Sequence, residues 1–493
     1  MAEQFLNFID GEWIAGSGSN PIADINPADT REVIGHATDS LEADVDAAVQ
    51  AAHGAFASWR STPAPVRGQI VAAAGRLFLE RVDQIAEVLT REEGKILAEA
   101  KGEVRKGSNL VEFLAGESRR LNGETIPSEM SKTFAYTLRV PLGVVGLITP
   151  WNFPMAIPAW KIAPALVCGN TVVLKGAEQT PWVSQLVVQA FVDAGVPKGV
   201  LNLIQGRGET AGAALVEHPL VEAISFTGST EIGHHIYARG AALGKPVQCE
   251  LGGKNPIIVL ADGDVDMAVA ATAKGAFGST GQRCTATSRA IVDARVHDQF
   301  VDALVREAGL VVPGNGLNPA TTMGPSVDQD QFDKVHEYLA IGPGEGVETR
   351  AGGGRATQGD LEFGLFTQPT VWTGVDRSMR IAREEIFGPV LSVLSVDGIE
   401  EALSVANDVE YGLTSSIYTR DVNKVFEYID HIETGMLHVN SPTIGGEAQL
   451  PFGGMKRTGV GPREQGPTAI EFFTEWKTVY IDYTGSMRGG NLY

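Results

Sequence analysis

The feature that most constrains the fold is a regular alternation of short apolar runs and helical patterns between residues 142 and 250. The apolar runs lie at 143–148, 171–174, 200–204, 223–226 and 246–250. A turn and a helical pattern follow each run except the last, which ends the series. This alternation predicts a parallel, doubly wound α/β sheet with helices on both faces. A second α/β stretch runs from about 254 to 450, with strands expected near 256–260, 287–293 and 390–395.

The regions flanking this alternation predict further parts of the molecule. The chain has 493 residues, which is too long for a single simple core. Amphipathic helices are expected at about 64–93 and 95–120, and a polar β-hairpin at 123–140. The segment 470–483 has the pattern of a strand with no partner next to it in sequence. We interpret the hairpin and this strand as elements that pair across a subunit interface, with pairing inside one chain as the alternative.

Charge and hydropathy exclude two classes of partner. The net charge of −21 repels nucleic acid and anionic membranes, so neither is expected as a partner. Residues 140–160 carry no charge, but they contain four prolines, which indicates a buried strand, a turn and a short helix rather than a membrane span. The first residues do not have the pattern of a signal peptide, and we therefore expect a cytoplasmic protein.

The three cysteines indicate catalysis rather than cross-linking. An odd, low number without paired spacing argues against disulfides and against a metal site, and for a reducing compartment. Cys168 and Cys249 lie in apolar contexts and are expected to be structural. Cys284 lies among glycine and small polar residues, and Glu250 ends an apolar run before two glycines. A thiol and a carboxylate together can perform covalent acyl chemistry, in which the thiol attacks a carbonyl and the carboxylate activates water.

Two loops carry weaker signals for a dinucleotide. The G-x-G-x-x-G pattern is absent, because the nearest match at 206–212 has one residue too many. The loop 226–233 follows a strand and opens a helix, whose N-terminus could face a pyrophosphate. Lys175 and Glu178 follow another strand and could bind ribose hydroxyls. A carboxylate at that place favours NAD over NADP, since it repels the 2′-phosphate.

Taken together, these segments resemble the aldehyde dehydrogenase superfamily over almost the whole chain. The resemblance rests on motifs in matching order and spacing: 150–154 (PWNFP), 175–181 (KGAEQTP), 226–233 (FTGSTEIG), 250–256 (ELGGKNP), 281–284 (GQRC), 384–389 (EEIFGP) and 451–454 (PFGG). It implies an aldehyde-dehydrogenase-like α/β fold with two Rossmann-like open domains and a small β oligomerisation element. The implied boundaries are an NAD(P)-binding domain at 1–122 and 142–252, a catalytic domain at 253–455, and the β element at 123–141 and 468–486.

The resemblance also implies roles for individual residues. Cys284 corresponds to the nucleophile, Glu250 to the general base, and Asn152 to an oxyanion-hole donor beside the Cys284 backbone N–H. The residues implied to bind the cofactor, NAD with NADP as a possibility, are Ile148, Thr149, Pro150, Trp151, Lys175, Glu178, Gly208, Phe226, Gly228, Ser229, Gly233, Leu251, Glu385 and Phe387. The residues implied to line the substrate pocket are Phe153, Ile157, Trp160, Arg283, Thr285 and Phe452.

The substrate prediction stays open between several alternatives. Arg283 and the runs 440–445 and 461–466 are similar to the 2,5-dioxopentanoate (α-ketoglutaric semialdehyde) dehydrogenase branch. Arg283 either binds a substrate carboxylate or belongs to a structural ion pair. A broad-range aliphatic aldehyde dehydrogenase is the first alternative. Three further alternatives fit less well. Glu250 argues against a CoA-acylating enzyme, and the intact set of Cys284, Glu250 and Asn152 argues against a non-catalytic protein of the same fold. The nucleotide loops argue against a cofactor-free thioesterase. The resemblance further implies a homodimer or homotetramer.

Overall fold

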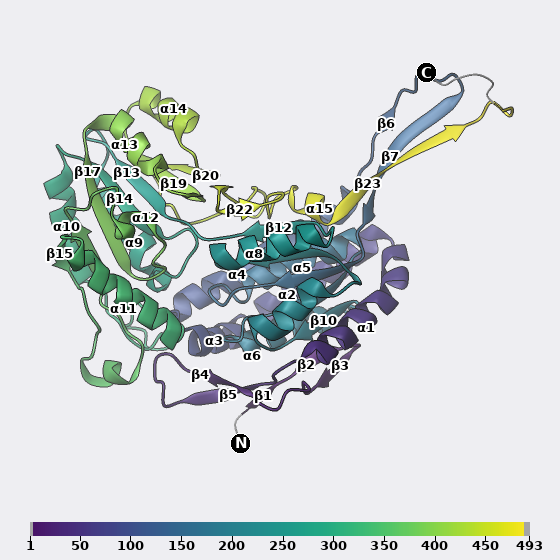
Figure 1. Ribbon diagram of the computed structural model, residues 1–493, viewed down its shortest axis with the longest axis horizontal. Coiled ribbons are helices and arrows are strands. Elements are labelled where there is room, and N and C mark those ends of the chain that lie inside the picture. The colour runs from purple at the N-terminus through teal and green to yellow at the C-terminus, as the bar shows by residue number, and fades with distance from the viewer. Residues whose placement is uncertain (1–2, 488–493) are drawn as a thin grey trace.

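The computed structural model describes residues 3–487 as two α/β bodies that lie side by side, with a long β arm projecting from one of them (Figure 1). The first body is formed by the N-terminal half of the chain, and the second by residues from about 255 to 440. Because the segments that close the first body come from both ends of the chain, the two bodies are linked by several crossings rather than by one linker.

The first body is built on an eight-stranded sheet in the order β22-β12-β11-β8-β9-β10-β2-β3. Its five central strands are parallel, which confirms the alternation predicted from sequence. Their bounds are β8 (Val144–Ile148), β9 (Thr171–Lys175), β10 (Leu201–Ile204), β11 (Val221–Thr227) and β12 (Val247–Glu250). Antiparallel strands close both edges: β2 (Asn7–Ile9), β3 (Glu12–Ile14) and β22 (Gly459–Val460).

Helices cover both faces of this sheet because its strands are apolar at successive positions. In β8, Val145 and Leu147 belong to the core on one face, whereas Val144 and Ile148 belong to the core on the other. The first face packs against α2 (Ala64–Glu80), α3 (Val82–Glu93), α4 (Leu97–Gly116), α5 (Ala156–Cys168) and α6 (Pro181–Asp193). The second face packs against α1 (Glu42–Ser61), α7 (Ala213–Glu217) and α8 (Thr230–Ala242). The helix expected over 64–93 is therefore two helices, which meet at Arg81.

The second body is built on a seven-stranded sheet in the order β15-β16-β17-β14-β13-β19-β20, in which only β15 is antiparallel. Its strands are β13 (Asn255–Val259), β14 (Thr287–Asp293), β15 (Glu348–Ala351), β16 (Thr370–Thr373), β17 (Val390–Val396), β19 (Thr414–Tyr418) and β20 (Met436–Val439). Its helices are α9 (Val265–Phe277), α10 (His297–Gly309), α11 (Gln329–Gly344), α12 (Arg380–Arg383), α13 (Gly398–Asn407) and α14 (Val422–His431). The strands expected near 256–260, 287–293 and 390–395 are confirmed.

The projecting arm shows the pairing inside one chain that was raised as the alternative. It contains β6 (Thr125–Ile126), β7 (Thr133–Pro141) and β23 (Thr474–Asp482), and β23 follows the short helix α15 (Ala469–Phe472). Strand β23 pairs with β7 of its own chain, antiparallel over nine residues of each strand, and pairing of the arm across a subunit interface stays a prediction. Sequence could not indicate this partner because more than 300 residues separate the two strands.

Two smaller sheets complete the fold. One joins β1 (Glu3–Phe5), β4 (Ile22–Ile25) and β5 (Val33–Ala37), and the other pairs β18 (Tyr411–Gly412) with β21 (Met455–Lys456). Within residues 3–487, no helix is both long and apolar enough to cross a membrane.

Candidate active site

Cys284 lies on a constrained loop between α9 and β14, at the junction of the two bodies. The loop begins with a 3₁₀ turn (Gly278–Gly281) in which Ser279 and Thr280 adopt φ angles of 48° and 58°. Such backbone angles cost energy for residues with side chains and are concentrated at functional sites. Gly281 also has a positive φ, of 69°, and a Cβ atom there would lie 2.1 Å from the carbonyl oxygen of Gly388. The loop therefore has little freedom to move.

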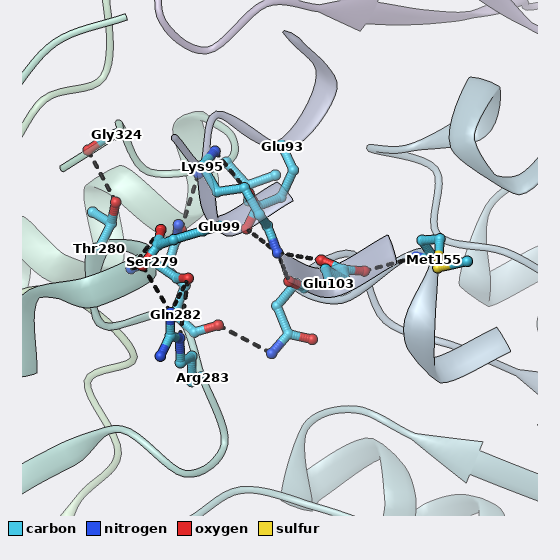
Figure 2. Close-up of polar contacts among 12 residues, drawn as sticks. Glu93, Lys95, Glu99, Glu103, Met155, Ser279, Thr280, Gln282, Arg283 and Gly324 are labelled. Atoms are coloured by element: carbon cyan, nitrogen blue, oxygen red, sulfur yellow. Dashed lines mark hydrogen bonds and ion pairs between the residues drawn. The ribbon is translucent and has the colours of Figure 1, made fainter. Parts of the chain in front are cut away.

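Polar contacts hold this loop against α4 and against the segment that precedes α11 (Figure 2). The hydroxyl of Thr280 donates to the carbonyl of Gly324 at 3.0 Å, and the backbone N–H of Ser279 donates to Glu99. Arg283 donates to the carboxylate of Glu99 at 2.8 Å and to the Ser279 hydroxyl at 3.0 Å. This ion pair is the structural alternative raised for Arg283 from the sequence, and a contact between Arg283 and substrate stays a prediction.

Asn152 lies on the loop between β8 and α5, next to the nucleophile loop. Its side-chain amide donates to the carbonyl of Gln282 at 3.0 Å, and its own carbonyl accepts a hydrogen bond from Lys95 Nζ at 2.7 Å. Asn152 is buried, so its amide is held at a fixed place rather than moving in solvent. A fixed amide donor beside a thiol is what an oxyanion hole requires.

Lys95 and Glu103 form a buried ion pair that anchors the Asn152 loop. Lys95 Nζ lies 2.6 Å from the Glu103 carboxylate, and it also lies 4.1 Å from the centroid of the Phe153 ring. The other oxygen of Glu103 accepts hydrogen bonds from the backbone N–H groups of Met155 (2.9 Å) and Ala156 (3.1 Å), at the start of α5 (Figure 2). A carboxylate at this place satisfies N–H groups that have no partner within the helix. The pair was missed from sequence, where both residues are ordinary members of an amphipathic helical region.

Glu250 is the last residue of β12 and is buried beneath the C-terminal segment. A Cβ atom at Gly453 would lie 2.5 Å from a Glu250 carboxylate oxygen, so glycine at that place makes room for the acid. Its Oε2 atom has no hydrogen-bond partner within the described chain. Burial and the charge of Glu464 raise the pKa of Glu250 well above its usual range, whereas Lys161 and Arg463 act in the opposite direction. A buried carboxyl group with a raised pKa and a free oxygen is suited to general base catalysis.

A second buried ion pair lies behind Glu250. Lys161 of α5 contacts the carboxylate of Glu464 and donates to the hydroxyl of Ser225 at 2.7 Å. The indole N–H of Trp160 donates to the same Glu464 carboxylate at 2.7 Å. This network fixes the wall that carries Trp160, and only its Trp160 member was predicted from sequence.

The environment of Cys284 keeps the thiol protonated at neutral pH. Burial raises its pKa to about 12, the charges of Glu250 and Glu385 act in the same direction, and Lys106 and the backbone N–H of Thr285 act against them. Since the thiolate is the nucleophile, the thiol needs a proton acceptor.

One cavity brings ten of the predicted residues together. The predicted residues that line it are Pro150, Trp151, Asn152, Ile157, Gly228, Ser229, Leu251, Cys284, Glu385 and Phe387. Sequence reasoning missed four more: Thr227, Gly252, Gln331 and Lys334. Gln331 lies in the first turn of α11 and donates to the carbonyl of Phe387 at 2.9 Å, which fixes the positive φ of 59° at Phe387. No sequence signal pointed to α11, because it is an amphipathic helix like several others.

The cavity wall formed by the first body fits a dinucleotide. Ser229 caps the N-terminus of α8 and accepts a hydrogen bond from the backbone N–H of Ile232. The first turn of α8 therefore presents N–H groups and a positive dipole end to the cavity, as pyrophosphate binding requires. Lys175 pairs with Glu178 at 2.7 Å beyond the end of β9. Glu385, half-buried and with its pKa raised by desolvation, accepts a hydrogen bond from the Gly253 N–H at 2.8 Å.

The remaining predicted residues surround the cavity without lining it. Ile148 and Thr149 lie at the end of β8, Phe226 lies in β11, Gly233 lies in α8, and Gly208 opens a short π-helix (Gly208–Gly212). Phe153 packs against the Lys95 ammonium, and the ring of Phe452 lies 5.8 Å from that of Trp160. Thr285 accepts a hydrogen bond from the Thr443 hydroxyl through its carbonyl, at 2.9 Å. Phe452 lines a neighbouring cavity with His438 and Gly446.

The fold and the site together define an oxidoreductase class in which a cysteine lies between a catalytic sheet and a dinucleotide-type sheet. Comparison with known proteins identifies the class: the sequence pattern of the aldehyde dehydrogenase family matches residues 13–479. The chain belongs to this family, which confirms the fold and the enzyme class predicted from sequence.

Individual relatives match over nearly their full lengths. The chain is 43% identical to an alpha-ketoglutaric semialdehyde dehydrogenase of Bacillus subtilis, covering 97% of this chain and 98% of the relative. It is also 43% identical to an alpha-ketoglutarate semialdehyde dehydrogenase of Haloferax volcanii, covering 98% and 100%. The fold is similar to that of betaine aldehyde dehydrogenase from Staphylococcus aureus in complex with NAD+, with a TM-score of 0.95, 35% identity, and coverage of 98% and 95%.

Proposed function

We propose that the protein oxidises a small semialdehyde that carries a carboxylate, with 2,5-dioxopentanoate as the first candidate, and that NAD accepts the hydride. The observation that carries this proposal is the pair of semialdehyde dehydrogenases at 43% identity over nearly the whole chain. The cavity supports it, because Cys284 and Asn152 line it together with Ser229, at a helix N-terminus suited to a dinucleotide.

The first half of the reaction uses Cys284 and Asn152. The thiol gives up its proton to water, and the sulfur then forms a bond to the aldehyde carbon. The carbonyl oxygen gains negative charge, which the Asn152 amide and the Cys284 backbone N–H stabilise. Bound NAD would supply the two-electron acceptor for the hydride of this carbon, and loss of that hydride would leave a thioester on Cys284.

The second half of the reaction uses Glu250. Its free Oε2 accepts a proton from water, and the resulting hydroxide attacks the thioester carbon. The carbon–sulfur bond breaks, the carboxylic acid leaves, and the thiol is restored. The raised pKa of Glu250 makes it a stronger base for this step than a solvated carboxylate.

The preference for NAD rests on Glu178. Burial alone would raise the pKa of Glu178, but the charge and hydrogen bond of Lys175 lower it overall, so the group is ionised at neutral pH. An ionised carboxylate accepts hydrogen bonds from ribose hydroxyls and repels a 2′-phosphate. The residues that would hold the cofactor are therefore Lys175, Glu178, Ser229 and Glu385.

A second candidate is a broad-range aliphatic aldehyde dehydrogenase. It is favoured by the apolar side chains that line the cavity near Cys284, among them Trp151, Ile157 and Phe387. These surfaces suit an uncharged chain as well as the methylene groups of a semialdehyde.

We further propose a homodimer or homotetramer that assembles through the projecting arm and functions in the cytoplasm. The arm exposes large apolar side chains that a monomer would leave in water, among them Phe134, Trp476 and Tyr480. In this proposal the NAD(P)-binding domain comprises 1–122 and 142–252, the catalytic domain 253–455, and the oligomerisation element 123–141 and 468–486.

Initial rates of nicotinamide reduction test the substrate proposal. The substrates are 2,5-dioxopentanoate, succinic semialdehyde, glyceraldehyde and propanal, each with NAD and with NADP and without CoA. We expect kcat/KM for 2,5-dioxopentanoate to exceed that for propanal by roughly ten- to a hundredfold, which corresponds to about 1.4 kcal/mol per tenfold. Equal values, or a preference for propanal, would instead support the broad-range candidate.

A further inference from the structure

Helix α4 turns a row of charged side chains toward the active site. Glu99, Glu103 and Lys106 follow one another at helical spacings of four and three residues and therefore lie along one face. Glu99 is bound to Arg283 and Glu103 to Lys95 (Figure 2). Both carboxylates on this face are thus already paired with another cation.

Lys106 is left without a counter-ion. Within residues 3–487 its ammonium group forms no hydrogen bond and no ion pair, although the side chain is half-buried. Its Nζ atom lies 5.8 Å from the centroid of the Trp160 ring, and 3.9 Å from the place that a Cβ atom would take at Gly446. Placing a cation in such a site has a cost in desolvation that only a weak cation–π contact offsets.

The position of Lys106 relates it to the nucleophile. Burial lowers the pKa of Lys106 and Arg283 adds to that shift, whereas Cys284 and Glu103 act against it. The ammonium group lies over Trp160, which is one turn along α5 from Ile157, a residue that lines the cavity of Cys284. Trp160, over which it lies, is held by its hydrogen bond to Glu464 and packs on Phe452, so this wall is rigid.

We propose that Lys106 binds the distal carboxylate of the semialdehyde while its aldehyde group is held at Cys284 and Asn152. This inference rests on the proposed function. An incoming carboxylate supplies the counter-ion that Lys106 lacks and accepts a charge-assisted hydrogen bond from it. Arg283, the residue suggested by sequence, does not need that counter-ion because Glu99 already provides one. Lys106 is therefore a specificity-determining residue: it selects carboxylate-bearing aldehydes over neutral ones.

The test compares two aldehydes of equal chain length, 2,5-dioxopentanoate and pentanal, in four enzymes. Lys106→Met removes the charge and keeps most of the side-chain volume, and Lys106→Arg keeps the charge. Lys101→Met is the matched control, since Lys101 lies on the same helix and pairs with Asp83 at the surface. Because a hydrogen bond to a charged group contributes more than a neutral one, we expect Lys106→Met to lower kcat/KM for 2,5-dioxopentanoate roughly ten- to a hundredfold, mainly through KM.

In the same variant, kcat/KM for pentanal should stay within about twofold of the wild type, which also shows that the variant folds. Lys106→Arg should recover most of the activity on 2,5-dioxopentanoate, and Lys101→Met should resemble the wild type with both aldehydes. A parallel loss on both aldehydes, or no loss on either, would overturn the role of Lys106. If Arg283→Leu lowers the preference and Lys106→Met does not, the carboxylate is bound by Arg283.

The design separates this inference from the proposed function. If the wild type does not prefer 2,5-dioxopentanoate to pentanal, the proposed substrate class is wrong. If the wild type shows the preference and Lys106→Met keeps it, the substrate class stands and only the assignment of Lys106 is wrong.

Discussion

The buried Lys95–Glu103 pair gives the sharpest prediction for stability. The Lys95 and Glu103 side chains are 1% and 0% exposed, and their charged atoms lie 2.6 Å apart. The replacement Lys95→Met leaves Glu103 as a buried charge without a counter-ion, and it leaves the Asn152 carbonyl without its donor. Breaking a buried pair from one side costs about 3–5 kcal/mol, because the remaining charge stays desolvated. We expect Lys95→Met to lower the free energy of unfolding by about that amount.

A neighbouring pair of nearly the same geometry provides the control. Lys101 lies 2.7 Å from Asp83, but these side chains are 32% and 82% exposed. An exposed pair contributes about 0.2–1 kcal/mol, because water and salt screen it. Lys101→Met should therefore cost at least about 2 kcal/mol less than Lys95→Met. The two variants remove the same charge from two parts of one helical region, so burial is the variable that differs.

Urea unfolding at one fixed protein concentration measures the stability of both variants. The shift of the urea midpoint, multiplied by the common m-value, gives the change in the free energy of unfolding. Activity gives a second readout, because the carbonyl that Lys95 anchors belongs to Asn152, the proposed oxyanion-hole residue. Loss of that anchor should lower kcat of Lys95→Met by roughly tenfold or more, since small displacements of an oxyanion donor are costly. Equal midpoint shifts for the two lysine variants would refute the reasoning.

Three further predictions concern charges at the site. Glu250→Gln should give a burst of nicotinamide reduction followed by steady-state turnover roughly a hundredfold or more below wild type, because hydrolysis of the thioester loses its general base. Unchanged turnover would exclude Glu250 from that step. Glu178→Gln should raise the ratio of kcat/KM for NADP to that for NAD by roughly tenfold, since it removes a charge that repels the 2′-phosphate; an unaltered ratio would count against this contact. Burial raises the pKa of Glu93 from 4.5 to about 8, so the folded protein holds a proton that the unfolded chain has lost between these pH values. The Glu93 carboxyl group therefore makes the wild type lose about 1.4 kcal/mol of stability per pH unit as pH rises through this window, and Glu93→Gln should remove that loss. Urea midpoints of both proteins, measured from pH 5 to 8, check the prediction. A difference between variant and wild type that does not change with pH would contradict it.

The parts of the site that sequence predicted share one physical origin. Parallel strands end at a common edge, so residues in the loops after them meet; Ser229 and Glu250 were noted at strand ends, and Asn152, which the family resemblance predicted, follows β8 at the same edge. The motif residues of the second body, Cys284 and Glu385, line the same cavity. Local patterns carry this information because the strand and the loop that follows it are adjacent in sequence.

The parts that sequence missed are charged residues on helix α4 and just before it. Lys95, Glu103 and Lys106 have the pattern of a solvated amphipathic helix, but contacts with the Asn152 loop bury Lys95 and Glu103, and Lys106 is half-buried. The choice between the two roles of Arg283 depended in the same way on Glu99, which is 184 residues away in sequence. Periodicity indicates which face of a helix is apolar, but it does not indicate which polar residues tertiary contacts will bury.

The edge strand β22 has a consequence for the order in which a growing chain acquires its active site. Gly459 of β22 pairs with Glu250, the last residue of β12. Glu250, the proposed base, therefore gains its neighbouring strand on one side from a segment about 200 residues further along the chain. During synthesis at about 5–20 residues per second, the nascent N-terminal body therefore emerges with β12 as an open edge for on the order of ten seconds or more. An open edge is a template for pairing with other chains. A nascent chain of this protein is consequently both inactive and exposed to aggregation until residues 459–482 leave the ribosome, which makes that interval the natural point for a chaperone to act.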